Sequence, residues 1–548
     1  MAPSDPDILY ASFGDGFLTS EGASWLCRSL DFGASWEIRS TVDYSKWQGW
    51  FSHDVAVSPD DPNEIVVVGI EVWRSENGGL TLSQTSVGGT GYSNPPPEGP
   101  DGLPNYVHSD AHDVIFHPIF PDVLYICSDG GIHQSFDGGF TFASRNGGLQ
   151  TAQFYNGFST SPTDPVFCMG GLQDNNTIRW NGDLTWTRFG GGDGSWTAIH
   201  PTDDDIFFYS SQYLSVRRTT DGGANFSSLT IPASSPVAFI APYVVSPAFG
   251  AYMYAGSAIV ARSTDGGSNW TVTNGGAPLD GNPALSMAAS HQNPLRVYVA
   301  TAPFGGRRSH VFVTHDGGDS WNDITGPLPD RFPMDLAVDP TDDAVAYVTW
   351  SGYGVGHLWR TNDYGQTWED IGQDLPDVPT NAVIVDPLFP NNIYVGNDIG
   401  VFASTDYGHT WMNYSEGFTD AVMVFDLQIS PVTRKLIAAT HGSGAFQRDL
   451  LELPLSTSAV GLPLPAVELW PNPAVIQLQV RIHGTALDQC RFSVVNEAGR
   501  TCHQFEGVHF SEGEKTWRLD VQDWEPGVYF FVVSKQGRSR SLPFVVSK

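Results

Sequence analysis

The chain is poor in basic residues and in cysteine. Lysine and arginine total 27 against 60 aspartate and glutamate residues, so the 548 residues carry a formal net charge of −33. Such an acidic chain argues against nucleic acid or an anionic membrane as a partner. Five cysteines are too few to cross-link a chain of this length, so we expect buried free thiols and a fold held together by its core.

Long apolar runs are absent as well. No stretch of about 20 consecutive apolar residues occurs, so no membrane-spanning helix is expected. The first ten residues, MAPSDPDILY, have neither the basic start nor the apolar middle of a secretory signal peptide. We therefore expect the supplied chain either to begin after such a signal or to be cut from a longer one.

What the chain does contain is a short repeated motif, Ser/Thr-x-Asp-x-Gly-x-x-Trp or a close variant, about every 45 residues. The copies begin at Ser29, Ser135, Thr219, Ser263, Thr314, Thr361 and Ser404, with a weaker copy at Ser75. The Asp at the head of this turn can accept hydrogen bonds from backbone N–H groups two residues on, and the Gly supplies a positive φ. The terminal aromatic residue is then free to wedge between neighbouring sheets.

Each motif follows short runs rich in β-branched and aromatic residues, the first of which ends near a proline. The order strand, turn, strand, turn, strand, motif, strand predicts a four-stranded propeller blade. We predict the opening strands of nine blades at Asp54–Pro59, Asp113–Pro118, Phe154–Pro162, Trp196–Pro201, Val237–Pro247, Ala284–Pro294, Asp335–Pro340, Ala382–Pro387 and Phe425–Pro431. The first unit lacks an opening strand, and the unit at Phe154–Phe189 carries IRWNGDLTW in place of the motif.

These repeats resemble the Asp-box, or BNR, repeats of sialidases, of xyloglucanase-type glycoside hydrolases and of the ten-bladed propeller of the sortilin family. The resemblance implies that the box is a structural turn on the outer edge of each blade, away from the ligand face. The expected fold is all-β: a large propeller of about ten four-stranded blades over residues 1–450, followed by a small β-sandwich. A single large ring is preferred over a piece from which earlier blades are missing.

A second domain is predicted at residues 468–548, after a Pro-punctuated linker at 451–467. Its short alternating strands predict a β-sandwich. It resembles the type A C-terminal sorting domain of the type IX secretion system, on the strength of matches at Trp470–Pro473, Asn496–Arg500, Trp524–Tyr529 and Lys548. The resemblance implies the secretion machinery as a partner and a secreted or surface location.

Possible ligand residues are predicted where inner strands begin and where second strands end, because propeller loops there build one face. A long insert leads into an inner strand with His108, Asp110 and His112, which would face one side of an extended segment and suit a divalent metal, a ligand patch or plain strand capping. Further ligand-binding candidates are His53, Asp54, Asp113, Gln173, Asp174, Asn175 and Asp398. Trp47, Trp50, Trp196 and Trp350 are candidate platforms for sugar rings.

Two carboxylates across a cleft can hydrolyse a glycosidic bond. Asp129, in CSDGGIHQS, lies in a segment similar to the one that carries a catalytic Asp in xyloglucanase-type hydrolases, and Asp193 is a candidate partner. Sialidase chemistry is set aside because the chain has no Arg-Ile-Pro segment and few Arg on inner strands. The leading prediction is a secreted propeller that binds a polysaccharide or protein ligand. The alternative is a glycoside hydrolase acting on plant or algal polysaccharide.

Overall fold

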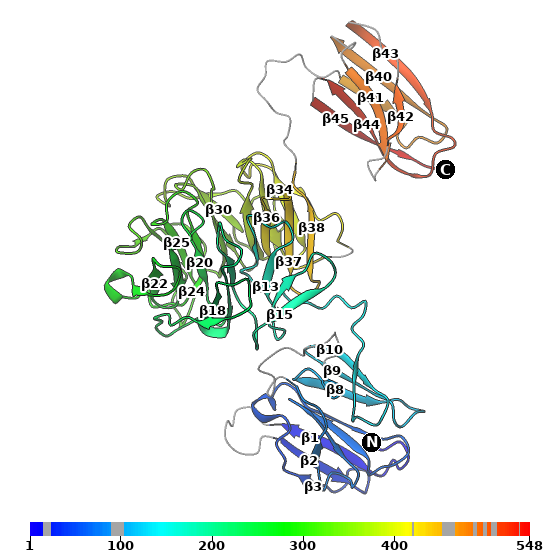
Figure 1. Ribbon diagram of the computed structural model, residues 1–548. Coiled ribbons are helices and arrows are strands. Elements are labelled where there is room, and N and C mark those ends of the chain that lie inside the picture. Colours follow the sequence, from blue (N-terminus) through cyan, green and yellow to red (C-terminus); the bar gives the residue numbers. More distant parts are fainter. Residues whose placement is uncertain are drawn as a thin grey trace. The chain divides into compact units, whose positions relative to one another are not determined.

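The computed structural model (Figure 1) describes residues 1–14, 24–88, 103–418, 421–451, 466–485, 490–496, 501–505, 512–535 and 538–548. The chain divides into two compact units, Met1–Leu450 and Leu451–Lys548. Most of the predicted linker 451–467 lies outside the described residues. All five cysteines are free, and Cys127 and Cys502 are exposed rather than buried as expected.

Unit 1 consists of ten antiparallel sheets, and all nine predicted opening strands overlap an observed first strand. The all-β fold of mostly four-stranded sheets is therefore confirmed. The first three sheets are formed by β1 (Leu9–Gly14), β2 (Ser24–Ser29) and β3 (Glu37–Ser40); β4 (Asp54–Val57), β5 (Ile65–Val68), β6 (Val72–Ser75) and β7 (Ser83–Gln84); and β8 (Ala111–Phe116), β9 (Leu124–Ser128), β10 (Gly131–Ser135) and β11 (Ala143–Ser144).

The other seven sheets follow in chain order, and the last has three strands. They are β12 (Ser159–Thr160), β13 (Cys168–Gly171), β14 (Thr177–Trp180), β15 (Trp186–Phe189); β16 (Thr197–Ile199), β17 (Phe207–Ser211), β18 (Ser215–Thr219), β19 (Ser227–Ser228); β20 (Tyr243–Val245), β21 (Met253–Gly256), β22 (Val260–Ser263), β23 (Thr271–Val272); β24 (Ala284–Ala289), β25 (Val297–Thr301), β26 (Val311–Thr314), β27 (Asn322–Asp323); β28 (Pro333–Val338), β29 (Ala346–Trp350), β30 (Leu358–Thr361), β31 (Glu369–Asp370); β32 (Thr380–Val385), β33 (Ile393–Asn397), β34 (Gly400–Ser404), β35 (Met412–Asn413); and β36 (Val424–Ser430), β37 (Lys435–Thr440), β38 (Ala445–Asp449). Short 3-10 turns occur at Lys46–Gln48, Gln212–Leu214 and Asn274–Gly276.

These seven sheets close into a ring. Strand β12 contacts β36, and Phe154 N donates to Thr440 O at 2.9 Å, so the fourth sheet meets the tenth. Figure 1 shows the teal strands β13 and β15 beside the yellow strands β37 and β38. The number of sheets is the ten expected, but the ring closes over seven of them, which corrects the preference for a single ring of ten. Inner strands from all seven sheets line a central cavity of about 350 Å³.

The Asp box is a turn built around its first hydroxyl. In the copy at Thr314, Thr314 Oγ1 donates to Asp316 Oδ1 (2.8 Å) and accepts from Gly318 N (2.7 Å). Asp316 Oδ1 also accepts from Ser320 N (2.9 Å), four residues on rather than the two expected. The prediction that box tryptophans reach the neighbouring sheet is confirmed, because Trp368 Nε1 donates to Ile324 O and Trp411 Nε1 to Ile371 O, both at 2.7 Å.

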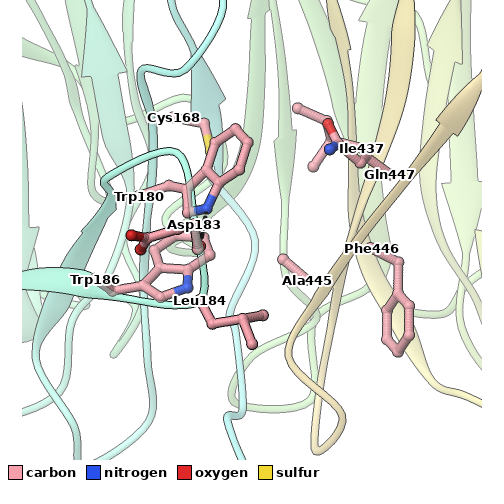
Figure 2. Close-up of a pocket in the computed structure, with 9 residues that line it drawn as sticks. All are labelled: Cys168, Trp180, Asp183, Leu184, Trp186, Ile437, Ala445, Phe446 and Gln447. Atoms are coloured by element: carbon pink, nitrogen blue, oxygen red, sulfur yellow. Dashed lines mark hydrogen bonds between the residues drawn. The ribbon is translucent and has the colours of Figure 1, made fainter.

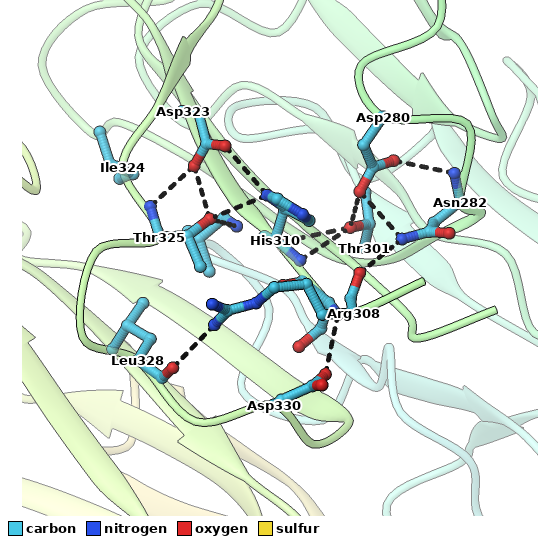
Figure 3. A network of polar contacts seen from close by, with 12 residues as sticks. Asp280, Asn282, Thr301, Arg308, His310, Asp323, Ile324, Thr325, Leu328 and Asp330 are labelled. Atoms are coloured by element: carbon cyan, nitrogen blue, oxygen red, sulfur yellow. Dashed lines mark hydrogen bonds and ion pairs between the residues drawn. The ribbon is translucent and has the colours of Figure 1, made fainter. Parts of the chain in front are cut away.

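A second kind of polar network stiffens the loops of one blade (Figure 3). Thr301 Oγ1 donates to Asp280 Oδ2 at 2.7 Å, and His310 Nδ1 lies 2.9 Å from Asp323 Oδ2. Arg308 Nη2 donates to Leu328 O at 2.9 Å. These hydrogen bonds hold the loop between β25 and β26 in place.

Unit 2 is a two-sheet sandwich around one core that includes Ile482, Phe492, Phe531 and Phe544. Its strands are β39 (Ala466–Trp470), β40 (Gln477–Thr485) and β43 (Glu512–Asp520) in one sheet, and β42 (Thr501–Phe505), β41 (Cys490–Asn496), β44 (Gly527–Lys535) and β45 (Arg538–Val546) in the other. Within the Trp470–Pro473 motif, Asn472 Oδ1 accepts from Val545 N at 2.8 Å, which ties the start of the domain to its last strand. Residues 497–500 of the predicted hairpin motif lie outside the described part of the chain.

Candidate functional site

Four aspartates from separate loops gather into what we call the carboxylate cluster: Asp110, Asp129, Asp174 and Asp193. Asp110 precedes β8, Asp129 follows β9, Asp174 follows β13 and Asp193 follows β15. The loops meet directly, because Asn175 Nδ2 donates to Asp129 O at 3.0 Å. The sequence predicts three different roles for these four residues, namely metal ligand, ligand-binding residue and catalytic residue, and the structure brings them into one place.

Asp174 is the central member of the cluster. Its backbone N–H donates to Asp193 Oδ1 at 3.0 Å, and its φ of 57° places it in the left-handed region, which Asp tolerates better than most residues. Burial raises the pKa of Asp174 to about 6, and the negative charges of Asp193, Asp129 and Asp110 add to this rise. A carboxyl group with such a pKa can give or take a proton near neutral pH.

Asp110 is the least satisfied member. Its Oδ1 is buried and has no hydrogen-bond partner among the residues that the structure describes. Burial, followed by the charge of Asp129, raises the pKa of Asp110. Polar atoms buried without a partner are rare, and at a cluster of this kind such an atom is available to a ligand.

Asp193 is a buried member of the cluster, and both its oxygens are engaged. It is 9% exposed, and its two oxygens accept from Asp174 N and, at 2.5 Å, from Gln212 Nε2. Burial and then the charges of Asp193 and Asp174 raise the pKa of the Tyr155 hydroxyl. Asp193 therefore positions the Asp174 loop.

The predicted metal triad does not converge. His108 lies within hydrogen-bond distance of Ser109 O (2.9 Å) and Asp174 O (3.1 Å), whereas His112 Nε2 lies 2.7 Å from Asp129 Oδ1. Asp110 has a φ of 62°, so the segment is not extended there and the expected alternation of side chains is lost. Within the described residues, no group of three or more His, Cys, Asp or Glu side chains could hold a metal ion.

Of the other predicted ligand residues, His53 and Asp54 contact the neighbouring blade, whereas Asp398 bonds within its own blade. Asp54 Oδ2 accepts from Val114 N at 3.1 Å, and burial, with Asp113 nearby, raises the pKa of Asp54. His53 Nδ1 lies 2.7 Å from Ser12 Oγ, and burial lowers the pKa of His53. Asp398 Oδ1 accepts from Asn381 Nδ2 at 2.9 Å.

Gln173 belongs to the same loop as Asp174. Its backbone N–H donates to Gln153 O at 2.9 Å, and its carbonyl accepts from Asn175 Nδ2 at 3.2 Å. Gln173 therefore shapes the loop that carries Asp174.

Two more aspartates, which the sequence analysis did not single out, line the central cavity. Asp335 Oδ2 accepts from Val383 N (3.0 Å), and Asp426 Oδ2 accepts from Gly157 N (2.6 Å) and Phe158 N (2.9 Å). Burial raises the pKa of both carboxyl groups, and the charge of Asp426 further raises the pKa of Asp335. A sequence signal existed, since Asp54, Asp113, Asp335 and Asp426 all stand five residues before the proline that ends their strand.

A second cavity, of about 390 Å³, lies at the seam of the ring (Figure 2). Cys168, Trp180 and Trp186 line one side, and Ile437, Ala445 and Phe446 line the other. Trp180 and Trp186 belong to the blade that has IRWNGDLTW in place of an Asp box. The cavity is therefore lined by residues that differ from the repeat. Its walls are mostly apolar and hold no acid–base pair.

Only some of the proposed aromatic platforms are exposed. Trp47 and Trp50 are 56% and 63% exposed, whereas Trp196 and Trp350 are 9% and 0% exposed and belong to the core.

Within the described residues, no helix has the length and apolar character needed to cross a membrane.

Solved structures with detectable similarity are propellers of low identity. A YCF48 protein from Cyanidioschyzon merolae is 13% identical, with 57% of this chain and 98% of that chain covered and a TM-score of 0.43. A GH74 enzyme from Niastella koreensis is 14% identical over 88% of this chain and 81% of that one, with a TM-score of 0.28. The GH74 xyloglucanase from Xanthomonas campestris is 14% identical over 100% and 90%, with a TM-score of 0.27. No curated protein matches significantly.

The C-terminal unit gives a clearer result. Residues 468–547 match the family model of the secretion system C-terminal sorting domain. The motifs at Trp470–Pro473 and Trp524–Tyr529 that predicted this domain fall inside the match. The chain therefore ends in a type IX sorting domain, which marks a secreted or cell-surface protein.

Proposed function

We propose that this protein is an exported propeller that binds a glycan at the carboxylate cluster. The observation that carries the proposal is the meeting of Asp110, Asp129, Asp174 and Asp193 from four separate loops. Sugar hydroxyls are good donors to carboxylate oxygens, and the unpartnered Asp110 Oδ1 would gain a donor on binding. The negative charges of Asp193, Asp129 and Asp110 act on Asp174, and a donor-rich neutral ligand would relieve this repulsion.

A glycoside hydrolase acting on plant or algal polysaccharide is the second candidate, and the raised pKa of Asp174 favours it specifically. A retaining or inverting mechanism needs one protonated carboxyl group and one carboxylate. Asp174 would protonate the leaving oxygen, and Asp129, held by His112, would act as the carboxylate. In this reading Asp193 is a positioning residue rather than the acid–base partner first expected.

One experiment tests both proposals. Xyloglucan, β-glucans and algal polysaccharides are offered to the full chain and to Asp129→Asn, Asp174→Asn and Asp193→Asn, with binding and release of reducing ends measured together. Asp398→Asn is the matched control, because Asp398 bonds Asn381 outside the cluster. Binding that weakens in the cluster variants without any release supports a binding protein, and release lost in Asp129→Asn and Asp174→Asn supports a hydrolase. Binding and release that are both unchanged in all three cluster variants would overturn both proposals.

A further inference from the structure

An exposed aromatic pair lies beside the carboxylate cluster on the ring. Tyr213, in the turn after β17, and Phe239, in the loop before β20, are 62% and 42% exposed. Their rings meet edge to face with centroids 5.4 Å apart, and Tyr213 N donates to Phe239 O at 3.0 Å. The two loops of adjacent blades thus hold a fixed aromatic surface open to solvent.

The backbone under Tyr213 is strained. Tyr213 and Leu214 have φ values of 56° and 65°, in the left-handed region that side chains other than glycine, asparagine and aspartate seldom adopt. The buried Leu214 packs against Phe208 and Ala241 and anchors the turn. Strain of this kind persists only where surrounding structure imposes it, and it collects at functional sites. Here it presents an aromatic ring to solvent, which core packing alone does not require.

The pair is tied directly to the cluster. Gln212, the residue before Tyr213, donates from Nε2 to Asp193 Oδ2 at 2.5 Å. Asp193 in turn accepts from the backbone of Asp174. Tyr213 is therefore the direct chain neighbour of Gln212, the residue that holds Asp193 and with it the cluster in place.

A second exposed aromatic pair is connected to the cluster through His112. Trp50 and Phe51 are 63% and 43% exposed, with ring centroids 5.3 Å apart. Phe51 packs edge to face on His112 at 4.6 Å, and His112 Nε2 lies 2.7 Å from Asp129 Oδ1. Asp129 is thus connected to one exposed aromatic pair through His112, and Asp193 to the other pair through Gln212.

We propose that the Tyr213–Phe239 and Trp50–Phe51 pairs are stacking subsites for a linear chain of sugar residues that crosses the carboxylate cluster. This inference rests on the proposed glycan-binding function and adds that the ligand is a polymer and not a single sugar. Aromatic rings offer an apolar face to the C–H surface of a sugar ring while hydroxyls reach polar groups beside it. Along a linear glycan, apolar ring faces alternate with hydroxyl edges. Aromatic rings would contact the apolar faces, and the acidic residues of the cluster would accept hydrogen bonds from the hydroxyls.

The test compares Tyr213→Ala, Tyr213→Gly and Trp50→Ala with the unaltered full chain. Phe304→Ala is the matched control, since Phe304 is also an exposed loop aromatic, at 49%, and lies between β25 and β26 outside the proposed site. The probes are xyloglucan and mixed-linkage β-glucan, together with their oligosaccharides from the monomer upward. Affinity of the unaltered chain should rise with oligosaccharide length. Tyr213→Ala and Trp50→Ala should each bind polymer about tenfold more weakly, whereas Phe304→Ala should not.

Tyr213→Gly separates recognition from folding. Glycine adopts a positive φ without strain, so this variant should melt at a higher temperature than Tyr213→Ala while binding equally weakly. If Asp174→Asn weakens polymer binding but the Tyr213 and Trp50 variants bind normally, the stacking subsites are refuted and the proposed function stands. If a monosaccharide binds as well as the polymer, the linear-chain inference is likewise refuted. If no probe binds and no cluster variant matters, the proposed function itself fails.

Discussion

At the scale of single residues, the hydroxyl that opens each Asp box organises the turn. Thr314 is fully buried and contacts both Asp316 and Gly318, whereas the Asp side chain faces outward and bonds the far end of the turn. The same arrangement recurs at Ser263 and Ser404. In the weak copy at Ser75, Asn77 takes the place of the Asp and still accepts from Thr81 N at 3.0 Å.

Removing that hydroxyl should therefore destabilise a blade. Thr314→Val keeps the shape of the side chain but leaves the buried Gly318 N–H without its acceptor, which costs about 1–3 kcal/mol of unfolding free energy. Chemical denaturation measures the loss. Thr314→Ser, which other copies of the box use naturally, should cost much less, and an equal loss for both would contradict this role of the hydroxyl.

Asp174 should make stability depend on pH. Because its folded pKa is raised to about 6, its favourable contribution is complete below its unfolded value near 3.8 and is lost as the pH rises through about 6. Asp174→Asn removes this titration, so the variant should gain melting temperature relative to the unaltered protein between pH 4 and pH 7. A difference that stays constant across this range would show that Asp174 titrates normally.

At the scale of strands, a single carboxyl group joins neighbouring blades at each of three seams. Asp54 binds the backbone of β8 and Asp335 that of β32, whereas Asp426 binds Gly157 and Phe158 ahead of β12. The last of these contacts joins the two ends of the seven-sheet ring. The last sheet of the ring, β36–β38, has three strands, and within the described residues no strand from the start of the chain is added to it.

Asp426→Ala should loosen the ring at its closure. Two buried N–H groups, of Gly157 and Phe158, lose their acceptor, so hydrogen exchange at these positions should accelerate and the melting temperature should fall. Asp335→Ala is the matched control, because it should accelerate exchange at Val383 and leave Gly157 unchanged. Unchanged exchange at Gly157 in Asp426→Ala would show that the seam is held by apolar packing alone.

At the scale of the whole molecule, the sorting domain and the proposed ligand site belong to different units. The sorting domain has its own core and matches its family over residues 468–547, whereas the carboxylate cluster lies entirely within Met1–Leu450. The type IX assignment therefore concerns delivery and carries no information about the ligand.

Deleting residues 468–548 should abolish export and spare the propeller. In a host with a type IX system, the truncated protein should accumulate inside the outer membrane, and its tryptophan-fluorescence melting transition should match that of the propeller in the full chain. A reporter fused to residues 468–548 should be exported. Secretion of the truncated protein would show that the signal lies elsewhere in the chain.

The strands and the boxes could be predicted from the sequence because each depends on residues close together in the chain, and the sorting domain could be predicted because its motifs are short and occur in a characteristic order. The bonds of the Thr314 box span only the seven consecutive residues 314–320, and each inner strand is recognisable by its apolar run before a proline. The closure of the ring between Asp426 and Gly157, 269 residues apart, emerges only from the three-dimensional packing of the blades. The same holds for the shared site of Asp129, Asp174 and Asp193 and for the contacts of His108 and His112 with carbonyl and carboxylate oxygens. Such pairings depend on how many similar blades fit around one axis and on the left-handed turns at Asp110 and Asp174, and the repeat itself encodes neither.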